Sequence, residues 1–148
     1  MGLDQYAYVA ARAGVQEERY AAEELLDESD IEGDARVKAE SEIAAMQPRE
    51  LAYWRKHPNL HGWMEQLWIE KNPGAHLQTS FNGVEVELNW DDLDRLEQAV
   101  NSGTLPTTTG FFFGNASDEY YQPQDLEFIK FARSELFCGL RVFYNSSW

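Results

Sequence analysis

The segment from Gln16 to Gln47 holds eleven acidic and three basic residues, a net charge of −8 in 32 residues. Its composition, rich in Ala, Glu and Leu, favours helices over 17–28 and 34–46, joined by a polar turn. Only a thin stripe of apolar residues runs along these helices, so they have little surface to bury against a core. We therefore expect a peripheral arm or insertion, with a helical hairpin as one arrangement, and a core built by the rest of the chain.

The whole chain, 1–148, has the length of a single domain, and 43% of its residues are hydrophobic. Its net charge of −14 argues against direct binding to nucleic acid or to an anionic membrane, because phosphate contacts need a basic surface. The lack of a long apolar run and of a signal-peptide pattern predicts a cytoplasmic protein without a membrane span. Cys138 is the single cysteine, so neither an internal disulfide nor a thiolate metal cluster is expected.

Outside the acidic segment, strand-like and helix-like patterns alternate along the chain. A long helix is expected to open at Gln47-Pro48, to break or kink near His57 because of Pro58, and to end near 72–74. The other patterns predict strands at 3–9, 84–88 and 140–144 and helices at 89–101 and 123–138. Together they indicate an α+β fold, or an α/β sandwich, in which a small mixed sheet packs with about four to five helices.

Several enzyme signatures are absent. The chain lacks the patterns of phosphate-binding loops, dinucleotide folds, nucleophile elbows and zinc proteases. His57, His61 and Glu65 are spaced four residues apart, and one continuous helix would place them on one face as metal ligands. Pro58 breaks that register. We therefore predict no metal and no cofactor, with His61 partly buried and His57 at the surface.

The stretch from Tyr53 to Trp63 is the richest mixture of aromatic and cationic side chains. In one interpretation Trp54 and Trp63 belong to the core, while Arg55 and Lys56 pair with acids at the surface. In the other they line a pocket, where an arginine can bind an anionic group and stack on an aromatic ring. The residues fit both interpretations.

A second unusual stretch, TGFFFGNASDEYY, runs from Thr109 to Tyr121. Its three phenylalanines, 111–113, predict a short buried strand or tight connection with all three rings in the core. The acidic pair at 118–119 fits the start of a helix, where the dipole favours acids. It also fits an ion pair with Arg55, or the wall of a site at the end of a core strand.

Four motifs are spread over both ends and the middle of the chain: MGLD-x-Y at 1–6, YWRK with His-x-Trp at 53–63, LPT-x-x-GFFFG…DEYY at 105–121 and FY-x-SSW at 143–148. Together they resemble a family of small phage, prophage and bacterial proteins. The resemblance implies a small intracellular protein of phage type, without implying a particular activity. It also implies the following site residues: Asp4, Trp54, Arg55, Lys56, His61, Trp63, Asp118, Glu119, Tyr120, Ser146, Ser147 and Trp148.

The terminal Trp148 is expected to be tucked in, with its carboxylate near Arg55 or Lys56. We expect an accessory binding protein that engages a host protein through segment 16–47, or a small ligand. The alternative is a small enzyme or nucleotide-like ligand binder, with Arg55 for an anionic group and Asp118 or His61 for proton transfer. Its pocket would also include Trp54 and Tyr120. A third hypothesis is an acidic DNA mimic that inhibits a nucleic-acid enzyme.

Overall fold

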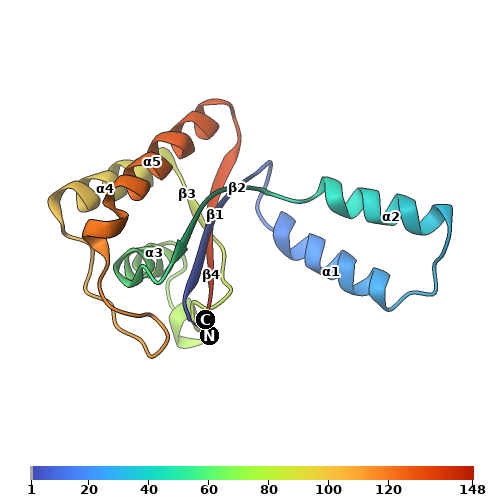
Figure 1. The fold of residues 1–148 in the computed structure, drawn as a ribbon, viewed down its shortest axis with the longest axis horizontal. Coiled ribbons are helices and arrows are strands. Elements are labelled where there is room, and N and C mark those ends of the chain that lie inside the picture. Colours follow the sequence, from blue (N-terminus) through green and yellow to red (C-terminus); the bar gives the residue numbers. More distant parts are fainter. Residues whose placement is uncertain (1) are drawn as a thin grey trace.

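A computed structural model describes residues 2–148, and a four-stranded sheet forms its centre (Figure 1). The strands are β1 (Asp4–Ala10), β2 (Arg49–Arg55), β3 (Val86–Leu88) and β4 (Arg141–Ser147), in the order β2-β1-β4-β3. All pairings are antiparallel, so the sheet is not the mixed one expected from the sequence. The α+β class is confirmed.

Three helices build the core on one side of this sheet: α3 (Pro58–Lys71), α4 (Trp90–Ser102) and α5 (Asp118–Phe137). A single 3-10 turn, η1 (Ala75–Leu77), follows α3. Alternation along the strands decides which side chains reach the core. Ala7, Trp54, Val142 and Tyr144 point to the helices and are fully buried. The side chains that alternate with these residues, such as Tyr6 and Tyr53, point to the opposite side of the sheet, which we call its open face.

The acidic segment forms a helical hairpin that projects from the sheet, as Figure 1 shows. Its helices are α1 (Val15–Asp27) and α2 (Asp34–Ala45), close to the predicted ranges. Leu26 and Ile43 are the buried residues of the two helices, whereas Leu25 and Val37 are exposed. We call residues 16–47 the acidic arm. Within residues 2–148, no helix has the length and apolarity needed to cross a bilayer.

The first part of the helix predicted from Gln47-Pro48 is wrong, because residues 49–55 form strand β2 along β1. Tertiary pairing decides here over local helix-like spacing, as is common for strands. The second part of that helix is confirmed as α3. Pro58 is the first residue of α3 and does not kink a longer helix. Its fixed φ suits that position and it has no amide hydrogen that would be left unpaired. His57 becomes the residue that caps the helix.

Of the two predicted forms of 111–113, the tight connection is confirmed, whereas the buried strand and the burial of all three rings are wrong. The residues form a turn, closed by the Phe113 amide on the Gly110 carbonyl at 3.1 Å and followed by Gly114 at φ +79°. Phe113 is buried, but Phe111 is 95% exposed. Helix α5 begins at Asp118, ahead of the predicted start near Pro123. In contrast, α4 lies close to its predicted range of 89–101, with Asn89 as its N-cap and Gly103 as its C-cap.

Candidate functional site

Arg55 lies on the open face of the sheet, opposite Asp4 of β1. Its Nη1 atom is 2.7 Å from Asp4 Oδ1, which also accepts a 2.5 Å hydrogen bond from the Tyr53 hydroxyl. These two contacts, the tyrosine first, lower the pKa of the Asp4 carboxyl. Arg55 therefore has its own acid on the neighbouring strand, and the predicted ion pair with the acids at 118–119 does not form.

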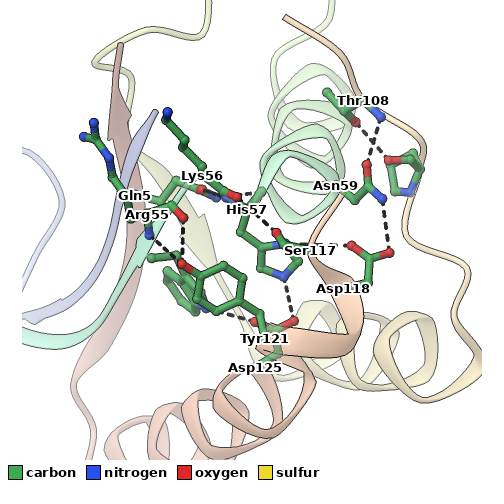
Figure 2. Close-up of polar contacts among 12 residues, drawn as sticks. Gln5, Arg55, Lys56, His57, Asn59, Thr108, Ser117, Asp118, Tyr121 and Asp125 are labelled. Carbon is green, nitrogen blue, oxygen red and sulfur yellow. Dashed lines mark hydrogen bonds and ion pairs between the residues drawn. The ribbon is translucent and has the colours of Figure 1, made fainter. Parts of the chain in front are cut away.

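A buried polar cluster lies where β2, α3 and α5 meet (Figure 2). His57 is fully buried, and its Nε2 atom lies 2.8 Å from Asp125 Oδ2. Asp125 Oδ1 accepts a 2.9 Å hydrogen bond from the Trp54 indole, and the Tyr121 ring stacks on the imidazole at 4.8 Å. Burial is the main cause that raises the pKa of the Asp125 carboxyl. The predicted surface position of His57 is wrong, because the chain turns inward before α3.

Hydrogen bonds to the backbone of Lys56 and His57 hold this part of the chain in place. The Gln5 side chain accepts a hydrogen bond from the His57 amide at 2.8 Å and donates one to the His57 carbonyl at 3.1 Å. The preceding residue, Lys56, has a φ of 56°, which is uncommon for a residue other than glycine. The Ser117 hydroxyl donates to the Lys56 carbonyl at 3.0 Å, so the loop before α5 supports this turn.

Two buried atoms of this cluster face each other without a hydrogen-bond partner. His57 Nδ1 and Asp118 Oδ1 are 3.8 Å apart, which is too far for a direct hydrogen bond. The other Asp118 oxygen accepts from Asn59 at 3.1 Å, and Asn59 in turn accepts from the Thr108 amide at 3.0 Å (Figure 2). The cluster thus ties the loop before α5 to the start of α3.

His61 lies in a separate, aromatic environment. Its Nδ1 atom is 2.9 Å from the Tyr144 hydroxyl, and the rings of Phe81, Phe113 and Trp148 surround the imidazole. Burial lowers the pKa of the His61 imidazole to about 4. It is neutral and enclosed at neutral pH, which argues against its predicted role in proton transfer. His57 and His61 have different partners, and no group of three metal-ligating side chains exists within residues 2–148. The structure therefore gives no support to a metal site formed by these two histidines and Glu65.

The structure does not bring the predicted site residues into one pocket. Trp63 belongs to the core, whereas Glu119 and Tyr120 are exposed on the first turn of α5. Trp148 is tucked against His61 as expected, but its backbone amide and carbonyl bond to Asn82 at 3.1 and 2.9 Å. No ion pair joins Trp148 to Arg55 or Lys56 in the part of the chain that the structure describes.

A groove of about 520 Å³ lies between the open face of the sheet and the acidic arm. This volume lies within the usual range for ligand sites. Burial, followed by the charges of Asp4 and Glu50, raises the pKa of the Tyr6 hydroxyl at this groove. Of the predicted site residues, Ser146 and Ser147 lie here. The groove is lined by Tyr6, Tyr8, Gln16, Arg19, Tyr20, Gln47, Pro48, Glu50, Gly83, Asn145, Ser146 and Ser147.

The buried polar cluster and the groove both contain residues that were not predicted from the sequence. Asp118, Tyr121 and Asp125 share one face of α5 by their spacing of three and four, a signal that the misplaced helix start at Pro123 concealed. Tyr6 and Tyr8 share one face of β1 by alternation. Comparison with protein-family models, with curated proteins and with solved structures found no match, so the family resemblance stays a prediction.

Proposed function

We propose that this protein is an intracellular accessory binding protein, of the phage type that the resemblance implies, and that it engages a basic protein partner through the acidic arm. One observation carries the proposal. The arm projects from the sheet with a net charge of −8 while it contributes only two buried residues from its helices, Leu26 and Ile43. A segment with so small a part in the core is free to serve an interface.

The acids of the arm are largely available to a partner. Three of the eleven, Glu18, Glu23 and Glu40, pair with arginines at 2.5, 2.5 and 3.0 Å. The other eight form no ion pair within residues 2–148. Uncompensated charges of one sign raise the association rate of an oppositely charged partner and help to select it.

The arm also offers apolar anchors, which an interface needs for affinity. Leu25 and Val37 are 68% and 65% exposed, and Tyr20 and Ile31 are also exposed. The surface of the arm thus has exposed apolar side chains surrounded by acidic ones. It complements a partner surface that has an apolar centre and basic residues around it. A nucleic-acid enzyme has such a basic face, so the DNA-mimic hypothesis is a special case of this proposal, in which DNA competes for the partner.

The enzyme hypothesis has weaker support. Trp54 and His61 are buried in separate environments, and Tyr120 is 79% exposed on α5. Arg55 is already paired with Asp4. These residues therefore provide no common pocket in which an anion, a stacked ring and a proton donor would meet.

The test is quantitative capture of proteins from a bacterial lysate by the tagged chain and by two variants. The arm variant carries Glu24→Gln, Glu28→Gln and Glu42→Gln, all at exposed positions. The control variant changes as many exposed acids outside the arm, Asp91→Asn, Glu119→Gln and Glu127→Gln. We expect a basic protein that the original chain and the control retain and that the arm variant loses. Equal retention by the two variants contradicts the proposal.

A further inference from the structure

The groove between the sheet and the acidic arm is rich in tyrosine rings. Tyr6 and Tyr8 reach it from β1 and Tyr20 from α1. Tyr53 of β2 extends this surface, because its ring lies 5.3 Å from the Tyr6 ring. Tyrosine faces attract cations through their electron-rich π systems. Tyr6, Tyr20 and Tyr53 all keep more than a third of their surface exposed, so a ligand can reach them.

The charges around these rings leave one carboxylate without a partner. Arg19 is held by Glu23 at 2.5 Å, and Arg55 is held by Asp4 at 2.7 Å. Glu50 lines the groove and forms neither an ion pair nor a side-chain hydrogen bond within residues 2–148. The groove therefore has one free negative charge next to an arm of net charge −8.

The protein already contains one example of the contact that this groove favours. The Arg19 guanidinium lies 4.8 Å from the centre of the Tyr20 ring while Glu23 neutralises its charge. A tyrosine face together with a glutamate thus holds a guanidinium at the wall of the groove. On the sheet side of the groove, Tyr6 of β1 and Glu50 of β2 supply the same two groups, and the Glu50 charge acts on the Tyr6 hydroxyl.

We propose that the groove binds an arginine side chain of the basic partner, between the tyrosine rings and Glu50. This inference rests on the proposed function and names the side chain that the partner inserts. An arginine fits better than a lysine, because its planar guanidinium stacks on an aromatic ring and has five N–H donors in fixed directions. The side-chain oxygen of Gln47 at the groove can accept from those donors, and Asn145 Oδ1, which accepts from the Ser146 amide at 2.7 Å, has a second lone pair.

The test uses a single amino acid derivative as the probe, so that it does not depend on the partner. N-acetyl-arginine amide is titrated into the isotope-labelled protein, and backbone amide signals are followed by NMR. N-acetyl-citrulline amide, which has the same shape without the charge, is the matched probe. We expect saturable shifts at Tyr6, Tyr20, Glu50 and Asn145 with the arginine probe and no saturable shifts with the citrulline probe.

Two variants locate the site. Glu50→Gln removes the free charge at an exposed position, and we expect it to weaken binding of the arginine probe by about two- to fivefold. Tyr6→Leu removes one ring face, with a loss of similar size. Glu127→Gln, an exposed change outside the groove, should leave binding unaltered. Equal binding of both probes, no saturable binding, or an unaltered affinity of the Glu50→Gln variant overturns the inference.

The outcomes separate this inference from the proposed function. If the arginine probe shifts only the amide signals of acidic residues in α1 and α2, and none at the groove, the arginine site is overturned. The acidic arm then still stands as the surface that binds the partner. Saturable binding at the groove, combined with a partner that the arm variant retains fully, overturns the role of the arm and keeps the arginine site.

Discussion

Acidification destabilises the fold through His61. The His61 imidazole is buried among aromatic rings, which lowers its pKa from 6.5 to about 4. Between these two values the unfolded chain binds a proton that the folded chain does not, so stability is present above pH 6.5 and falls as the pH drops. At about 1.4 kcal/mol per pH unit, the loss at pH 4 is about 3 kcal/mol.

The assay is urea unfolding at pH 7 and at pH 4, for the original chain and for His61→Phe. The phenylalanine keeps a ring in the aromatic environment and removes the titrating group. Carboxylates also titrate in this range, but they are common to both chains and cancel in the comparison. We expect the original chain to lose about 3 kcal/mol more than the variant between the two pH values.

The control is His76→Gln, which replaces a histidine at an exposed position away from the aromatic environment of His61. A His61→Phe variant with the same pH dependence as the original chain refutes the reasoning. An NMR titration of the imidazole signals gives an independent check, because the His61 signal should titrate near pH 4 in the folded protein.

Three further predictions concern the buried cluster, the loop before α5 and the arm. Asp125→Ala costs about 3–5 kcal/mol in chemical denaturation, because it leaves the Trp54 indole and His57 Nε2 unpartnered. Asp125→Asn costs under about 1 kcal/mol, because His57 can change tautomer. Its Nε2 atom then accepts from the new side-chain amide, and its Nδ1–H donates towards Asp118. Equal costs for the alanine and asparagine variants contradict this prediction. A Cβ atom at Gly62 would overlap the Thr108 hydroxyl and lie 2.9 Å from Thr108 Cβ, so Gly62→Ala costs about 1–3 kcal/mol. Thr108→Ala in the same chain recovers part of that cost, and no recovery would show that the clash is not the cause. Replacement of residues 16–47 by a short linker should lower the melting temperature, measured by circular dichroism, by less than about 10 °C. Loss of cooperative unfolding in this variant would show that the arm is part of the core.

Those parts of the fold that depend on local signals could be predicted from the sequence. The helix at 90–102 has a capping residue, first-turn acids and a terminal glycine, and these act within a few residues of each other. The arm could be predicted because its composition alone rules out a large buried face. The short apolar run after Gly139 predicts the last strand at 140–144, and it lies at 141–147.

Those parts that depend on distant contacts could not be predicted. The segment 49–55 has helix-like spacing, and only its pairing with β1 makes it a strand. His57 looks like a surface residue in the sequence, because its partners Gln5 and Asp125 are 52 and 68 residues away. The groove combines residues from β1, β4, α1 and the segment before β2, so no single stretch of sequence contains its pattern.

The association rate of the captured partner shows whether the acidic arm attracts that partner. It is measured for the original chain and for the variant with Glu24→Gln, Glu28→Gln and Glu42→Gln, between about 50 mM and about 500 mM salt. If the acidic arm attracts a basic partner, the original chain associates about tenfold or more faster at low salt than at high salt, and the variant shows a smaller difference. Equal rates for both chains, without a dependence on salt, contradict the account.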